Sequence, residues 1–144
     1  MEDAIGIKMI RHIISLLAII AVVLNEPTKP KIIEATKGQE LIAPDSLKWE
    51  IGNAFSAMFK RNKISLEQAL TGFKVFQKIQ IRYPETDFEN ALKISFENNV
   101  YAYDAYFLSL AKKHQCPFIT LDEPLLKLAS KLGIKIIEVN NDNI

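Results

Sequence analysis

Short apolar segments alternate with stretches of helical periodicity along most of this chain. The expected strands are 13–16, 40–43, 80–83, 118–120 and 134–139, and the expected helices are 18–24, 31–37, 47–61, 65–79, 87–98, 103–114 and 124–131. Parallel strands need long crossover connections, which are usually helices that cover the sheet. We therefore expect an α/β fold with three α/β/α layers around a central parallel sheet of four to five strands.

The length and composition fit one ordered domain. The chain has 144 residues, of which 49% are hydrophobic and 24% charged, enough for a single hydrophobic core. We assign residues 11–140 to the domain, 1–10 to an N-terminal extension and 141–144 to a C-terminal tail. The net charge of +1 gives no strong overall field, so any binding of nucleic acid must rely on local patches.

The single cysteine and the apolar segment 13–24 both indicate in which cellular compartment the protein is found. Cys116 is the only cysteine, which excludes an internal disulfide and a cysteine-based zinc site. The segment 13–24 follows basic residues, as in a signal peptide, but Asn25-Glu26-Pro27 offers no cleavage site and the run is too short to span a bilayer. We expect a buried strand that leads into a buried helix, in a cytoplasmic protein with no membrane partner.

Three acids stand at the ends of expected elements. Asp104 opens the helix 103–114, Asp122 follows the strand 118–120, and Glu50 lies in the second turn of its helix. Each has an ordinary alternative: a first-turn acid favoured by the helix dipole, an N-cap, and a solvated flank, respectively. Residues just past the carboxyl ends of parallel strands line a ligand crevice. Taken together, the three acids indicate a Mg²⁺ or Mn²⁺ site completed by water and phosphate.

With these residues in view, the chain resembles the PIN-domain family, most closely its VapC-type toxins. The segment 103–111 (YDAYFLSLA) is similar to the third acidic motif, and Thr120-Leu121-Asp122 to the fourth. The segment 43–54 (APDSLKWEIGNA) looks like the second motif, with Glu50 as its acid. In the first motif, 18–27 (AIIAVVLNEP) fits the family's helix and Glu-Pro.

The first motif departs from the family at its acid. Ser15 stands where the family has a strand-end Asp, and Leu17 stands where it has a small hydroxyl residue. A neutral Ser cannot replace the charge of a metal-site carboxylate. A displaced acid such as Glu26 is one possible substitute.

The resemblance implies a metal-dependent endoribonuclease. Glu50, Asp104 and Asp122 would be its catalytic and metal-binding acids, with Mg²⁺ or Mn²⁺ as cofactor. It also implies a toxin that acts on RNA, forms a homodimer and is blocked by an antitoxin protein. Candidate contacts to the RNA backbone are two basic clusters: Lys60, Arg61 and Lys63, and Lys112, Lys113 and His114. The alternative for both clusters is a solvated turn or helix end.

Two other function classes remain open from the sequence. Ser15 favours a PIN-fold module that binds RNA or protein but cleaves weakly or not at all. A phosphoaspartyl phosphatase or receiver-like protein is less favoured, because both need an Asp at the position of Ser15 and no glycine-rich phosphate loop is present.

The aromatic residues of the helices 47–61 and 65–79 also have two interpretations. We expect them in the core and a dimer interface, and the alternative is a groove for an antitoxin peptide. They are Trp49, Phe55, Phe59, Phe73 and Phe76.

Overall fold

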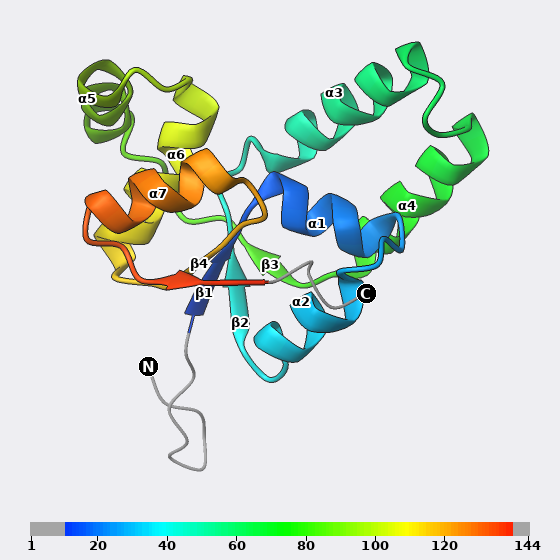
Figure 1. Ribbon diagram of the computed structural model, residues 1–144, viewed down its shortest axis with the longest axis horizontal. Helices are drawn as coiled ribbons and strands as arrows, with labels where there is room; N and C mark the ends of the chain where they lie inside the picture. Colours follow the sequence, from blue (N-terminus) through cyan, green and yellow to red (C-terminus); the bar gives the residue numbers. More distant parts are fainter. Residues whose placement is uncertain (1–10, 140–144) are drawn as a thin grey trace.

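The computed structural model describes residues 11–139 (Figure 1). The predicted extension 1–10 and tail 141–144 lie outside the described residues. The strands are β1 (Arg11–Ile14), β2 (Glu40–Ile42), β3 (Ile81–Arg82), β4 (Phe118–Ile119) and β5 (Ile136–Ile137). The helices are α1 (Leu16–Val23), α2 (Lys29–Thr36), α3 (Leu47–Lys60), α4 (Leu66–Lys78), α5 (Phe88–Asn98), α6 (Ala102–His114) and α7 (Glu123–Lys131).

The five strands form one parallel sheet in the order β3-β2-β1-β4-β5. Every neighbouring pair in this sheet is parallel. In Figure 1, helices α5, α6 and α7 stand on one side of the strands, and α1 to α4 on the other. The predicted three-layer α/β/α fold with a parallel sheet is therefore confirmed.

The core centres on the two middle strands, β1 and β4. Ile13, Ile14, Phe118 and Ile119 are all buried, because helices cover both faces of these strands. The helix α1 that follows β1 is also largely buried. The apolar segment 13–24 is thus the predicted buried strand and helix. Within residues 11–139, no helix is long and apolar enough to cross a membrane.

The helix starts correct two sequence predictions. Ser15 was expected in the first strand, but β1 ends at Ile14 and Ser15 is the N-cap of α1. The sequence Thr86-Asp87-Phe88-Glu89 predicts a capping box that starts at Thr86, but Asp87 is the N-cap of α5 and its side chain accepts the N–H of Asn90 at 3.0 Å. An ionised acceptor at this position also interacts favourably with the helix dipole.

The sequence Ser65-Leu66-Glu67-Gln68 predicts a capping box at the start of α4, and the structure confirms it. Ser65 Oγ accepts the N–H of Gln68 at 3.1 Å, and Gln68 Oε1 accepts the N–H of Ser65 at 2.8 Å. The reciprocal pair satisfies two backbone donors that a helix start otherwise leaves unpaired. It fixes where the α3–α4 hairpin turns back towards α1.

Close contact between α4 and α1 depends on Gly72. A Cβ at this position would lie 3.2 Å from Leu24 Cδ2 and 3.3 Å from the Val23 carbonyl oxygen. We expect Gly72→Leu to lower the free energy of unfolding by about 1–3 kcal/mol, because the added side chain overpacks this contact. Thermal unfolding measures the effect.

Gly52 provides the matched control for this prediction. It lies in α3 with no atom within 4 Å of its would-be Cβ. Gly52→Ala should raise stability by about 0.5–1 kcal/mol, because it removes the backbone entropy cost of a helical glycine. An unchanged melting temperature in Gly72→Leu would show that α4 does not pack against α1 in this way.

Candidate active site

The strand order creates a switch point between β1 and β4. The chain leaves β1 towards β2 on one side, whereas β4 leads to β5 on the other. Ile14 pairs with Ile119, and the N–H of Ser15 donates to the carbonyl of Ile119 at 3.0 Å. At such a point the loops that follow the strands diverge and leave a crevice beyond their carboxyl ends. Ser15 and the residues after β4 therefore lie side by side at this edge.

Asp122 is positioned by local hydrogen bonds just beyond β4. The buried Thr120 accepts the N–H of Asp122 on its hydroxyl at 3.1 Å. Asp122 Oδ1 accepts the N–H of Leu125 at 3.1 Å and caps α7. The predicted N-cap role is therefore correct, and it fixes the carboxylate at the crevice. The Thr-x-Asp spacing has a local structural cause: the Thr120 hydroxyl accepts the N–H of Asp122, and the Asp122 carboxylate accepts the N–H of Leu125.

Glu50 and Asp104 complete a row of acids at the same edge. Burial raises the pKa of Asp104, and the neighbouring charge of Asp122 raises it further. Burial also raises the pKa of Glu50; a hydrogen bond from Ser46 partly offsets this, and the charge of Asp104 adds to the rise. Such shifts are expected where like charges face one another in a partly desolvated site. The structure thus brings the three predicted acids together, with Asp104 between the other two.

Ser46 orients Glu50 within this row. Its hydroxyl donates to Glu50 Oε2 at 2.7 Å. Ser46 is the N-cap of α3, but its side chain makes no capping bond. Its hydroxyl instead donates its hydrogen bond to Glu50.

The position of Ser15 supplies no charge to the row. Its side chain is 3% exposed, and its Oγ accepts the N–H of Ala18 at 3.3 Å. Leu17, at the expected place of a small hydroxyl residue, is partly exposed. The edge of the sheet at β1 is therefore neutral where the resemblance implies an acid.

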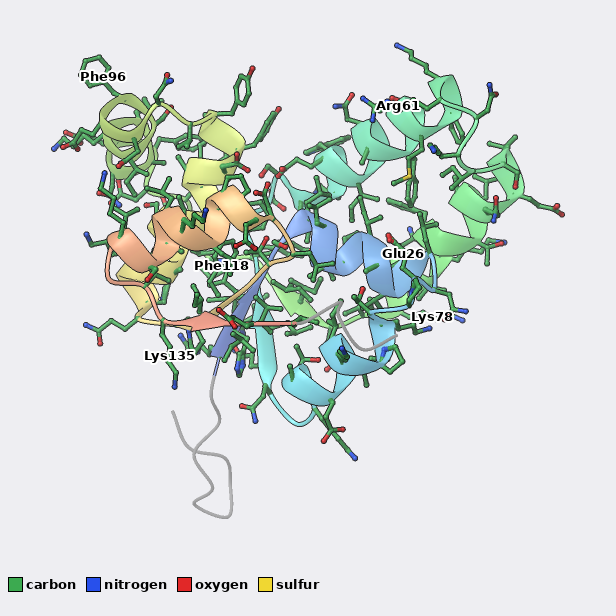
Figure 2. All side chains as sticks on the ribbon, in the orientation of Figure 1. Glu26, Arg61, Lys78, Phe96, Phe118 and Lys135 are labelled. Atoms are coloured by element: carbon green, nitrogen blue, oxygen red, sulfur yellow. The ribbon has the colours of Figure 1, made fainter. Side chains whose placement is uncertain are left out.

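Glu26 does not lie at this edge. It follows the opposite end of α1, an eight-residue helix about 12 Å long, and Figure 2 shows it well away from the carboxyl end of β1. There it lines a cavity of about 790 Å³ with Met58, Arg61 and Lys63. The interpretation of Glu26 as a displaced site acid is therefore wrong.

The acids are the type of ligand that a hard cation prefers, but their side chains do not form one compact metal-binding group. Carboxylates that repel one another in a partly buried site suit Mg²⁺ or Mn²⁺. Within residues 11–139, however, no group of three or more His, Cys, Asp or Glu side chains lies close enough to hold a metal ion. The acids interact as neighbouring pairs, Glu50 with Asp104 and Asp104 with Asp122. The arrangement is an open row of carboxylates.

Neither basic cluster lies beside the acids. Lys60, Arg61 and Lys63 are at the far end of α3, about 15 Å from Glu50 along the helix (Figure 2). Lys112 and Lys113 are exposed in the last turn of α6, about 12 Å from Asp104.

His114 belongs to that same far end of α6. Burial lowers its pKa, and the charges of Arg11 and Lys113 lower it further. Its neighbour Arg11 begins β1, so this end of α6 lies at the amino-terminal edge of the sheet, opposite the acids. For Lys112, Lys113 and His114 the geometry favours the helix-end alternative.

The exposed aromatic residues near the acids were not predicted. Trp49 precedes Glu50 and is largely exposed, so it lies outside the core, and its place in a dimer interface stays a prediction. Phe55 and Phe76 are buried in the core as predicted. Tyr101, the N-cap of α6, is also largely exposed. A signal was available for Trp49, because it falls outside the helical spacing of the apolar stripe on α3.

The capping role of Ser15 gives a stability prediction. We expect Ser15→Ala to lower the free energy of unfolding by about 1 kcal/mol, because it removes the acceptor for the Ala18 N–H. For a domain of this size the melting temperature should fall by about 2–4 °C. Ser56→Ala is the control, since Ser56 is exposed within α3. Equal melting temperatures for Ser15→Ala and the unmodified chain would exclude a stabilising cap.

The raised pKa of Asp104 gives a pH-dependent prediction. A carboxyl whose pKa is higher in the folded than in the unfolded chain destabilises the fold once the pH exceeds both values. We expect Asp104→Asn to raise the melting temperature at pH 7, with a gain that shrinks as the pH falls towards the ordinary pKa of an Asp. Calorimetry across this range measures it. A lower melting temperature for Asp104→Asn at neutral pH would show that the carboxylate is stabilised by its surroundings.

Comparisons with known proteins agree on the fold. Compared with proteins of curated function, the chain has no significant sequence match. Among solved structures, it is similar to PAE2754 from Pyrobaculum aerophilum, with a TM-score of 0.63 and 16% identity over 84% of this chain and 87% of that one. It is also similar to VapBC2 from Rickettsia felis bound to a DNA fragment from its promoter, with a TM-score of 0.63 and 9% identity over 91% of this chain and 100% of that one.

A third similar structure is a domain of a functionally unknown protein from Methanocaldococcus jannaschii, with a TM-score of 0.52 and 17% identity over 93% of this chain and 95% of that one. At these identities the likeness establishes the fold alone. The family model for the PIN domain matches residues 18–131, which include Glu50, Asp104 and Asp122. Because that match covers most of the sequence, the chain belongs to the PIN domain family.

Proposed function

We propose that this chain is a metal-dependent endoribonuclease that hydrolyses RNA phosphodiesters, as a VapC-type toxin of a toxin–antitoxin pair. The observation that carries the proposal is the row of three partly buried acids, Glu50, Asp104 and Asp122, at the switch point of the sheet. Besides burial, the charge of Asp122 raises the pKa of Asp104, and the charge of Asp104 raises the pKa of Glu50. Perturbed carboxylates in such a crevice are typical of functional sites. PIN-family membership supports a nuclease in general.

The roles of the chain's residues follow from their contacts. Glu50, Asp104 and Asp122 would hold Mg²⁺ or Mn²⁺, directly or through water. When bound, such a cation activates water for attack on the phosphodiester and offsets the phosphate's negative charge. Ser46 fixes one oxygen of Glu50, and Thr120 fixes the backbone of Asp122. Without a cation the acids would repel an RNA backbone, so either a bound metal or the removal of one of these charges should favour RNA binding.

The partners in this proposal are RNA, an antitoxin protein and a second copy of the chain. The similar structure from Rickettsia felis is named as VapBC2 bound to promoter DNA, which supports an antitoxin partnership for proteins of this fold. We propose that the chain pairs with an antitoxin and acts on RNA in the cytoplasm.

A specific observation favours a second candidate, a PIN-fold module that binds RNA or protein and cleaves weakly or not at all. Ser15 leaves the site one carboxylate short, and the remaining acids form no closed group of three within the described part of the chain. Fewer negative charges weaken attraction for a hard cation. If this second candidate is right, adding Mn²⁺ should change the melting temperature little.

Cleavage of a labelled RNA in Mn²⁺, with EDTA as the control, tests the proposal. We expect this chain to cut, EDTA to stop the cutting, and Asp104→Asn to lower the rate by at least about 100-fold, because the acid needed for the metal is lost. Ser15→Asp should cut faster, since it restores a fourth carboxylate. Glu97→Gln, an exposed acid on α5, is the matched control and should leave the rate unchanged.

The possible results separate the two candidates. If only Ser15→Asp cuts, the site is correctly located and this chain is a disabled nuclease that binds. Cutting that persists in EDTA or in Asp104→Asn would overturn the metal-dependent reaction at these acids. If neither this chain nor Ser15→Asp cuts RNA, the nuclease proposal is wrong for the RNA tested.

A further inference from the structure

Two exposed aromatic side chains flank the row of acids. Trp49, the only tryptophan of the chain, is 71% exposed, and Tyr101 is 84% exposed. Large aromatic side chains are normally well buried, because each removes much apolar surface from water. Their exposure here is not explained by the packing of the domain.

These two residues come from the starts of different helices, each of which also carries one of the acids. Trp49 immediately precedes Glu50 in the first turn of α3, and Tyr101 lies three residues before Asp104, on the same side of α6. Glu50 and Asp104 sense each other's charge, so the first turns of α3 and α6 lie close together. One aromatic residue therefore borders the acids from each helix.

A positive charge accompanies the tryptophan. Lys48 Nζ lies 5.4 Å from the centre of the Trp49 ring and 3.5 Å from Asp45 Oδ1. The cation–π contact and the ion pair hold the ammonium beside the ring. An exposed aromatic face and an exposed ammonium are thus presented together, next to Glu50.

The tyrosine side of the site has further support. Tyr103, directly before Asp104, is 54% exposed and meets Tyr106 edge-on at 5.9 Å between ring centres. Tyr106 in turn meets Phe88 edge-on at 5.4 Å. These contacts brace the rings at the start of α6.

Aromatic faces beside cationic side chains are the general means of holding single-stranded nucleic acid, because every base has a face that can stack. In a duplex those faces are already occupied. We infer that Trp49 and Tyr101 are the residues that stack on the bases flanking the scissile phosphate, with Lys48 contacting the backbone. This inference rests on the proposed nuclease function, and it assigns binding residues that the acidic motifs do not include.

Phe96 supplies a matched control. It is 90% exposed and lies on the outer end of α5, away from the acids (Figure 2). A replacement there removes a similar exposed aromatic side chain without altering the proposed stacking positions.

The test measures RNA binding in the full chain carrying Asp104→Asn, which the proposed function makes inactive. The probes are a short fluorescein-labelled oligoadenylate and the same strand paired with oligouridylate. We expect the single strand to bind more tightly than the duplex and to quench the Trp49 fluorescence. Trp49→Leu and Tyr101→Leu should each weaken single-strand binding by about 10-fold. Trp49→Phe should keep most of the affinity, and Phe96→Leu all of it.

Several results would overturn the inference. If Trp49→Leu and Tyr101→Leu bind the single strand as tightly as the parent, stacking is wrong, while cleavage by the unmodified chain would still support the nuclease. If Trp49→Leu instead dissociates an oligomer in sedimentation and leaves RNA affinity unchanged, Trp49 belongs to a contact between copies. If no RNA binds and the unmodified chain cuts none, the inference and the proposed function both fail.

Discussion

The parallel pairing of β1 with β4 is the constraint on which the site depends. More than a hundred residues separate these strands in the sequence, yet Ile14 pairs with Ile119 and the N–H of Ser15 bonds the carbonyl of Ile119. That register brings the starts of α1 and α7 together, and in Figure 1 α3 also begins near this edge. The apolar side chains of the two strands, buried between layers of helices, hold the pairing in place. The hydrophobic core therefore fixes where the acids meet.

The acids themselves work against folding. Asp104 neighbours both Glu50 and Asp122, and burial together with the charge of Asp122 raises the pKa of its carboxyl. Under the proposed function this strain has an explanation, because a bound cation would relieve the repulsion among the carboxylates. Stability lost at these positions is supplied by the core and by caps such as the Ser65–Gln68 box. This division between a stable core and a strained edge is common in enzymes.

Much of the fold was predictable from the sequence, and the candidate site only in part. Periodicity and turn residues located the elements because these signals are local. Boundaries were less certain: Ser15 follows two isoleucines and reads as strand, although its hydroxyl caps α1. Where the far ends of α3 and α6 lie relative to the acids was harder still to predict from the sequence. Only the long-range strand order shows that Lys112 and Lys113 lie opposite the acids.

Ser15 bears on chemistry more than on folding. Ser and Asp are about equally good N-caps, so the helix α1 does not require a hydroxyl in place of a carboxylate. The two residues differ in charge, and the backbone of Ser15 is bonded to β4, next to Thr120 and Asp122. An acid here would add repulsion to a row in which Asp104 already has a raised pKa. A neutral cap keeps the helix while lowering that repulsion, at the expense of attraction for a cation. The choice between nuclease and binding module therefore turns on the charge at this one position.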